Sequence, residues 1–409
     1  MTRESIETTL AFARDHIDDD PVQLLLHRQR HPGIDMQLVA QQLEGHRQAR
    51  TKWPALCADG RFLYPPRLNR EQSSSQAAAQ YKAALAAAVT DGQPLRIADL
   101  TGGMGIDSMH FALSGANVDY VEQNADLCTY AEYNFDAMGL DNLRCHCADG
   151  IQWLAGQPQP YDIIYVDPAR RDSHGAKTVA FEQCTPNILG HLPLLLGHCR
   201  YLMVKASPMA DIVGATRQLQ HVSQVHVVAV GGECKELLFL CSTNTNQAEE
   251  PLIVCVDLDK DGHTLHRNQF SPQQEAAAVA TYADSNVRQY LYEPHAALLK
   301  GGAYRSLCQW YGVYKLAPNT HLYTSDEMVG DFPGRIFRLL EELRLDTKSI
   351  KAALAKHGAG NSLHVISRNH PASAESILRQ YRLHEGGELY LIATTLHHHP
   401  AAFLCRRVK

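Results

Sequence analysis

The first four apolar runs after residue 94 each lead into a carboxylate: Asp99, Glu122, Asp149 and Asp167. If these runs are parallel strands, all four acids reach one edge of the sheet, where open α/β sheets bind their ligands. A single acid at such a position is usually a helix cap. Four acids at one edge predict a nucleoside-type ligand, with Asp99 placed to face a cationic amine and Glu122 to bind ribose hydroxyls.

A glycine-rich loop, Asp99-Leu-Thr-Gly-Gly-Met-Gly105, follows the first of these runs and opens a helix-like segment. Glycines let a ligand approach the backbone closely, and the unpaired N–H groups of a helix N-terminus can bind it. The loop nearly matches the dinucleotide fingerprint, but Ser108 stands where the third glycine is expected. Because a tight turn without a ligand needs the same glycines, the loop alone does not decide the function.

The elements that must position these residues alternate between short apolar runs and helix-like stretches from Leu95 onward. This alternation is typical of βαβ units that build a mainly parallel sheet. The last two runs, VHVVAVGG and ELLFLC, are joined by too few residues for a parallel crossover, so they are predicted to form an antiparallel hairpin. The fold class is therefore α/β.

The flanking regions have a different character. Residues 1–90 are predicted to be mostly helical, with Ser73 or Ser74 capping a helix and Gln72–Lys82 as a possible cofactor lid. The segment Asp257–Gly262 resembles a calcium loop, but position twelve is Asn268 and the flanks alternate, which favours a tight hairpin. A helix is predicted from Gly334, followed by two strand-like runs, SLHVIS and ELYLIATT.

The charge is unevenly distributed along the 409 residues. The net charge is −6, yet residues 333–409 contain 12 Lys and Arg against 6 Asp and Glu. This asymmetry suits a basic nucleic-acid-binding module on an acidic body, or an ordinary solvated surface. The 11 scattered cysteines contain no C-x-x-C, and no apolar run is long enough for a membrane span, so we expect a cytoplasmic protein with reduced thiols, no metal and no membrane.

Residues 95–242 resemble a class I S-adenosylmethionine (SAM)-dependent methyltransferase, with its Rossmann-like seven-stranded sheet and terminal hairpin. The resemblance implies SAM as the cofactor and Asp167-Pro168-Ala169-Arg170 as the motif beside the methyl group. The implied catalytic positions are Asp167, Pro168 and Arg170. The implied cofactor contacts are Asp99, Thr101, Gly102, Gly103, Gly105, Glu122, Gln123, Asp149, Gly150 and Asp167.

The whole chain resembles methyltransferases that carry a C-terminal THUMP-like domain preceded by a ferredoxin-like piece. The expected organisation is a helical region at 1–90, the methyltransferase domain at 91–245, a small ferredoxin-like α+β domain at 250–330 and a THUMP-like domain at 331–409. THUMP domains proper bind RNA in tRNA-modifying enzymes. The resemblance therefore implies RNA, and tRNA in particular, as the partner of the basic C-terminal domain, and it leaves the oligomeric state open.

The motif Asp167-Pro168-Ala169-Arg170 differs from the corresponding motif of amino-methylating methyltransferases. Ala169 and Arg170 replace the proline and aromatic residue of amino-methylating members, and the motif is closer to the D-P-P-R of RNA 5-methyluridine methyltransferases. Those enzymes use a nucleophilic cysteine, whereas the fifth run here ends in Lys205-Ala-Ser207-Pro208. Covalent base methylation is disfavoured, and direct in-line transfer is expected.

Several roles remain open. Arg170, Arg171 and Lys177 are candidates for phosphate contacts, and Lys205 could pair with a site acid or contact the substrate. The alternative functions are an RNA-binding protein with a relic cofactor fold, an NAD-dependent oxidoreductase, and a methyltransferase of a non-RNA acceptor.

Overall fold

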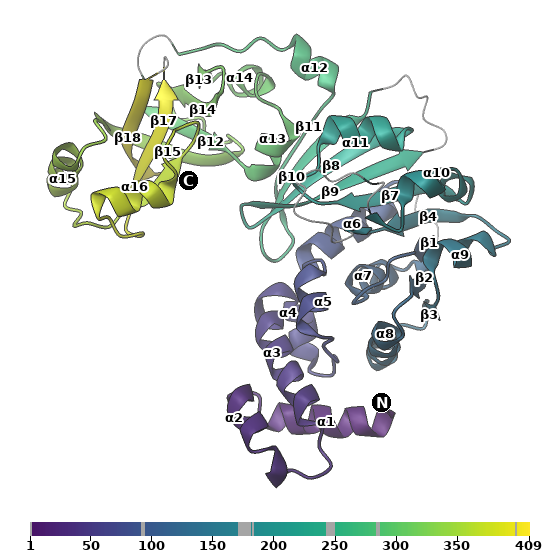
Figure 1. Ribbon diagram of the computed structural model, residues 1–409. Coiled ribbons are helices and arrows are strands. Elements are labelled where there is room, and N and C mark those ends of the chain that lie inside the picture. The colour runs from purple at the N-terminus through teal and green to yellow at the C-terminus, as the bar shows by residue number, and fades with distance from the viewer. Residues whose placement is uncertain are drawn as a thin grey trace. The chain divides into compact units, whose positions relative to one another are not determined.

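The computed structural model describes residues 2–409 except 91–94, 171–180, 182–183, 243–249, 284–286 and 397–398. The chain divides into two compact units, and Figure 1 shows their elements. The first unit contains Met1–Pro251 and Leu258–Leu265, and the second contains Leu252–Asp257 and His266–Lys409. Within the described residues, no helix is long and apolar enough to cross a membrane.

The first unit begins with helices, as predicted. They are α1 (Arg3–Asp15), α2 (Pro21–Leu26), α3 (Met36–Lys52), α4 (Pro54–Asp59), α5 (Arg67–Gln72) and α6 (Gln76–Ala88), with a 3-10 turn at Arg28–Arg30. The helix α1 is amphipathic and buries Ile6 and Leu10. The cap of α6 is Ser75, whose hydroxyl accepts from the Ala78 amide, so the predicted cap at Ser73 or Ser74 was wrong by one residue or more.

Seven strands of the first unit belong to the predicted α/β sheet. They are β1 (Arg96–Asp99), β2 (Asn117–Glu122), β3 (Leu143–Cys147), β4 (Tyr161–Val166), β7 (Cys199–Ala206), β8 (Val222–Val230) and β9 (Glu233–Ser242), arranged β3-β2-β1-β4-β7-β9-β8. The pairs from β3 to β7 are parallel, and β9 runs antiparallel to both β7 and β8. The predicted parallel strands and the antiparallel hairpin are therefore confirmed. The expected count of seven strands is wrong, because β10 (Leu252–Leu258) and β11 (Thr264–Phe270) follow β8 in the strand order and make nine.

Helices connect these strands: α7 (Ile106–Leu113), α8 (Ala125–Met138), α9 (Gly150–Ala155), α10 (Ile188–Gly197) and α11 (Ile212–Leu219). A two-stranded ribbon, β5 (Ala169–Arg170) and β6 (Cys184–Thr185), follows β4. Central strand residues such as Ile97, Ile164 and Leu202 are fully buried. This explains the apolar runs in the sequence, because parallel strands are covered on both faces.

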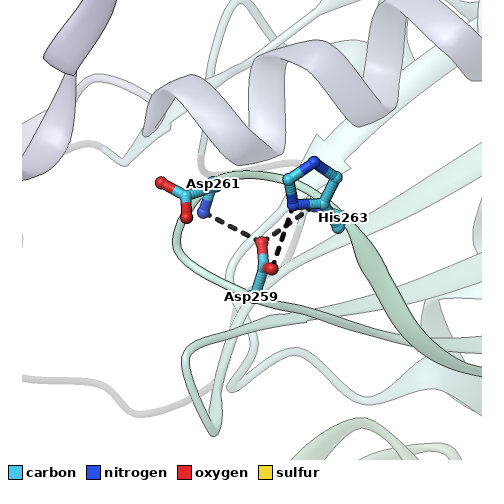
Figure 2. A group of neighbouring side chains, drawn as sticks. All are labelled: Asp259, Asp261 and His263. Carbon is cyan, nitrogen blue, oxygen red and sulfur yellow. Dashed lines mark hydrogen bonds and ion pairs between the residues drawn. The ribbon is translucent and has the colours of Figure 1, made fainter.

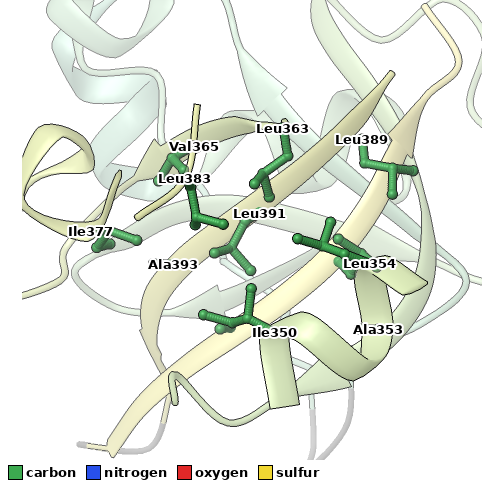
Figure 3. Close-up of a cluster of buried hydrophobic side chains, with 12 residues drawn as sticks. Ile350, Ala353, Leu354, Leu363, Val365, Ile377, Leu383, Leu389, Leu391 and Ala393 are labelled. Carbon is green, nitrogen blue, oxygen red and sulfur yellow. The ribbon is translucent and has the colours of Figure 1, made fainter. Parts of the chain in front are cut away.

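The second unit holds another sheet. Its strands are β12 (Tyr290–Pro294), β13 (Tyr314–Ala317), β14 (Thr320–Ser325), β15 (Gly334–Leu343), β16 (His364–Ser367), β17 (Leu389–Leu396) and β18 (His399–Arg407), in the order β13-β14-β12-β15-β18-β17-β16. Its helices are α12 (Pro272–Ala277), α13 (Ala296–Gly301), α14 (Ser306–Tyr311), α15 (Thr347–Lys356) and α16 (Ala374–Tyr381). Ile350, Leu354 and Ile377 from α15 and α16 pack in one buried cluster with strand residues such as Leu391 (Figure 3).

The predicted helix from Gly334 is wrong, because this segment forms the strand β15. Its Leu, Glu and Arg residues favour a helix, but β15 lies between β12 and β18 and pairs with both. Ile336 and Phe337 are fully buried there. Pairing on both sides and burial outweigh a helix propensity of less than about 1 kcal/mol per residue.

The calcium-like segment forms a tight turn between β10 (Leu252–Leu258) and β11 (Thr264–Phe270), as predicted. Asp259, Asp261 and His263 lie together there (Figure 2). The Asp259 carboxylate accepts hydrogen bonds from the backbone amides of Asp261 and His263 and contacts the His263 ring. These bonds explain the acid as a turn cap.

Candidate active site

The carboxyl ends of β1 to β4 surround a cavity of about 670 Å³. Asp99 and Glu122 are the last residues of β1 and β2, Asp167 follows β4, and Asp149 lies two residues beyond β3. In the sheet order β4-β1-β2-β3, these four ends are adjacent. A cavity of this size at this edge is in the range of small-ligand sites.

The structure brings most of the predicted site residues to the cavity wall. Those that line it are Thr101, Gly103, Glu122, Gln123, Asp149, Gly150, Asp167 and Pro168. Asp99, Gly102 and Gly105 do not line it and lie in the supporting loop. Arg170 is placed by its backbone in β5, opposite Cys184, while its side chain, Arg171 and Lys177 lie outside the described residues.

Asp99 holds the glycine-rich loop and the start of α7 through hydrogen bonds. Its side chain is buried and accepts hydrogen bonds from the Ser108 hydroxyl at 2.6 Å and the Thr101 amide at 3.1 Å. Burial raises the pKa of Asp99 to about 7, although the Ser108 hydrogen bond opposes this shift. Ser108, at the position of the missing third glycine, thus has a bonding role of its own.

The loop glycines allow close packing against β2. A Cβ atom on Gly102 would lie 2.2 Å from the Tyr120 ring, and the Tyr120 hydroxyl donates to the Gly103 carbonyl at 2.7 Å. Gly103 and Gly105 have positive φ angles of 55° and 81°. Tyr120 therefore fixes the path of the loop, and Gly102 is required by space.

We expect Gly102→Ala to destabilise the protein more than Gly103→Ala. The first change forces the loop away from Tyr120 and costs about 1–3 kcal/mol or more. At Gly103 the nearest atom to an added Cβ is 3.8 Å away, so the cost is only the left-handed backbone, about 1–2 kcal/mol. Urea unfolding of the two variants checks this, and equal costs would contradict the role of Tyr120.

Two acids on the wall keep capacity for a ligand. Glu122 accepts the Gly103 amide through one oxygen and the Asn124 amide through the other, at 2.9 and 2.8 Å. A carboxylate has about four acceptor sites, so Glu122 can also take hydroxyl donors. Asp149 caps α9 through a single oxygen, Oδ1, which accepts the amides of Ile151 and Gln152.

These features fit SAM. The wall combines acceptor carboxylates with the apolar side chains of Leu100, Met104, Ile106 and Leu127, as a ligand with polar ends and an apolar body requires. At Gly150 an added Cβ would lie 2.4 Å from the Leu100 carbonyl, so the wall is tightly built. Glu122 and Asp149 are the residues that would hold the hydroxyl and amino groups of a nucleoside.

Asp167 faces a lysine. The Lys205 ammonium at the end of β7 donates to Asp167 Oδ2 at 2.5 Å, which confirms that this lysine pairs with a site acid. The Asp167 backbone amide donates to the Thr101 hydroxyl at 2.7 Å. Burial lowers the pKa of Lys205, but the carboxylates of Asp167, Glu236 and Asp107 favour its charged form. Their attraction outweighs the effect of burial, so the pKa of Lys205 is raised.

A buried ionic cluster, which no motif of the sequence indicates, lies behind this pair. It contains Ser74, Lys82, Asp107, Tyr165 and Glu236. One available signal was Lys82, the single charged residue in the alanine-rich stretch 76–89. Its side chain is fully buried. From the possible lid segment, Gln72, Ser73 and Ser74 line the cavity.

Comparisons with known proteins agree with this architecture. Residues 290–333 match the model of a ferredoxin-like domain, and residues 334–407 match a THUMP domain-like model. A crystal structure described as a "putative methyltransferase from Porphyromonas gingivalis W83" is 29% identical, with a TM-score of 0.84 and 100% coverage of both chains.

Curated relatives match only in part. The chain is 31% identical over 121 residues to the 23S rRNA (uracil(1939)-C(5))-methyltransferase RlmD of Shewanella amazonensis, covering 27% of either protein. It is 29% identical over 118 residues to the 23S rRNA (uracil(747)-C(5))-methyltransferase RlmC of Vibrio vulnificus YJ016, covering 29% of this chain and 31% of that protein. The chain thus matches less than a third of these relatives' length. From the sheet order, the cavity and the full-length structural match, we conclude that the chain has the fold of class I SAM-dependent methyltransferases and carries C-terminal ferredoxin-like and THUMP-like domains.

Proposed function

We propose that the protein is a SAM-dependent methyltransferase that acts on RNA by direct in-line transfer. The observation that carries the proposal is the cavity at the ends of β1 to β4, which Glu122, Asp149 and Asp167 line. When bound, SAM would supply an activated methyl group. The chain would bind the nucleoside through Glu122 and Asp149, orient the acceptor through Asp167 and exclude water.

RNA is supported as the acceptor by two independent likenesses. The curated relatives are rRNA methyltransferases, and residues 334–407 match the THUMP domain-like model. The THUMP likeness favours tRNA, which we propose as the first substrate to test. An RNA substrate and 11 free cysteines also suit a protein that acts in the cytoplasm.

The C5 chemistry of the curated relatives is not carried over. Methylation of that carbon by covalent catalysis requires a cysteine nucleophile. Among the described residues, no cysteine lines the cavity, and the strand β7 leads to Ser207. Direct attack by an oxygen or nitrogen of the substrate remains as the mechanism that these residues support.

The test uses the purified full-length protein, tritiated SAM, and separate total tRNA and rRNA from a strain lacking the gene. We expect label in tRNA and its loss in Glu122→Ala, which removes the proposed ribose acceptor. Lys260→Met, an exposed change in the first unit, is the control. SAM binding without labelling of either RNA would contradict the proposal, and tight NAD binding without SAM binding would favour an oxidoreductase.

An arginine pair in the second unit predicts an RNA contact. Arg338 and Arg406 lie directly opposite each other on β15 and β18, and both are exposed. Like charges in such a pair repel, and within the described part of the chain no ion pair to either is found. We expect Arg338→Glu with Arg406→Glu to weaken tRNA binding about tenfold or more and to reduce its salt dependence.

Arg217→Glu, an exposed charge reversal in the first unit, is the control. Its tRNA affinity, measured by filter binding across salt concentrations, is expected to stay close to that of the wild type. An unchanged affinity of the Arg338 and Arg406 double variant would show that these arginines do not contact the RNA.

A further inference from the structure

A group of charged side chains lies at the inner end of the cavity, around Asp167 and Lys205. Besides the ion pair at 2.5 Å between these two, the Lys82 ammonium lies 2.7 and 2.9 Å from the two carboxylate oxygens of Glu236 and 3.2 Å from Asp107. Two lysines and three acids therefore meet in one place; they come from α6, α7, β7, β9 and the residue that follows β4.

Ser74 links the two ion pairs. Its hydroxyl oxygen accepts from Lys82 at 3.0 Å and from Lys205 at 3.4 Å, and it donates to Asp107 Oδ2 at 2.8 Å. The Tyr165 hydroxyl donates to the same Asp107 oxygen at 2.8 Å. The position of the Lys205 ammonium is therefore fixed by more than its partner Asp167.

The exposure of the side chains in this cluster falls with distance from the cavity. Asp167, Lys205, Asp107 and Ser74 line the cavity, whereas Lys82 and Glu236 lie behind them. The Lys82 and Glu236 side chains are 0% and 3% exposed, while that of Asp167 is 35% exposed. Buried ion pairs are often no more stabilising than apolar packing, so stability alone gives little reason for this arrangement beside a substrate cavity.

An ammonium beside the acceptor atom discriminates between the possible nucleophiles of RNA. An exocyclic amine gains positive charge as it takes up a methyl group, which a neighbouring cation opposes. A hydroxyl must lose its proton, and its oxygen gains electron density, which a cation stabilises. The carboxylate next to that ammonium can accept the proton. The Asp167–Lys205 pair is thus matched to a hydroxyl.

We propose that the acceptor is a ribose 2′-hydroxyl of RNA, with Asp167 accepting its proton and Lys205 stabilising the reacting oxygen. This inference rests on the proposed function and names its substrate class, since internal nucleotides of RNA offer no other ribose hydroxyl. The hydroxyl oxygen forms the new O–CH3 bond, the electron pair of the broken S–CH3 bond stays on sulfur, and the O–H proton passes to the Asp167 carboxylate.

The position of the methyl group in the product tests the proposal. RNA labelled by the full-length enzyme is hydrolysed with alkali, which cannot cleave next to a 2′-O-methyl group because cleavage uses the free hydroxyl. We expect the label in alkali-resistant dinucleotides. Label in mononucleotides would overturn this inference and leave RNA methylation intact, whereas unlabelled RNA would remove the proposed function and the inference together.

Variants and a modified substrate test the two residues directly. Lys205→Met and Asp167→Asn are each expected to lower kcat about 100-fold or more. For Lys205→Met, SAM affinity by calorimetry should stay within about twofold of the wild type. Lys260→Met is the matched control. RNA with a 2′-deoxy residue at the target should bind without being labelled. Parallel losses of rate and SAM affinity in Lys205→Met, or labelling of the deoxy RNA, would overturn the assignment.

Discussion

Lys82→Met lowers the free energy of unfolding of the first unit by about 3–5 kcal/mol, because it leaves buried carboxylates without their cation. The Lys82 ammonium is fully buried, and its partners Glu236 and Asp107 are also shielded from water. Methionine matches the size of lysine closely, so the loss reports on charge and not on a cavity. Urea unfolding followed by the emission of Trp53 and Trp153, in a Trp310→Phe background, measures it.

A double-mutant cycle separates this ion pair from general damage. Adding Glu236→Gln to Lys82→Met is expected to recover part of the loss, since the acid left unpaired is then neutral, and coupling energies of contacting residues reach about 0.5–3 kcal/mol. Lys260→Met, at an exposed position of the first unit, should change stability by no more than about 0.5 kcal/mol. If the effects of Lys82→Met and Glu236→Gln on the free energy of unfolding were strictly additive, a direct ion pair between the two residues would be contradicted.

Asp99→Asn removes a large part of the pH dependence of stability between about pH 4 and pH 7. Burial raises the pKa of Asp99 to about 7 in the folded protein, against about 3.9 in the unfolded chain. The native state therefore holds a proton that the unfolded chain has released, and stability falls as the pH rises through this window. At about 1.4 kcal/mol per pH unit, this one group costs the wild type about 4 kcal/mol by pH 7.

The asparagine variant should match the wild type near pH 4 and become the more stable protein by pH 8. Its side-chain carbonyl can still accept from the Thr101 amide, and its NH2 group can donate to the Ser108 hydroxyl, because a hydroxyl both donates and accepts. Ser108→Ala provides the opposite case, because loss of a hydrogen bond to the carboxylate raises the Asp99 pKa further and extends the falling limb to higher pH. A stability difference between Asp99→Asn and wild type that is constant from pH 4 to 8 would contradict this account.

Most of the first unit could be predicted because its signals are local. The apolar runs from LRIADL to ELLFLC became the strands β1 to β9 of the sheet, apart from the short β5 and β6, since buried parallel strands require continuous apolar residues. The short link at Gly231 and Gly232 determined the antiparallel hairpin. By contrast, the segment from Gly334 has a helical composition, and only its two neighbouring strands make it β15.

The sequence by itself determined which acids end the strands, which glycines shape the loop, and that the cavity lies at the carboxyl edge of the sheet. From the sequence, Lys205 could be expected to pair with one of the site acids, but the sequence did not show which one. Tertiary structure decided that Lys82 from α6 and Glu236 from β9, 154 residues apart, meet behind Asp167 and Lys205. Burial of an ionic cluster depends on contacts between distant segments, and neither spacing nor periodicity along one segment records such contacts.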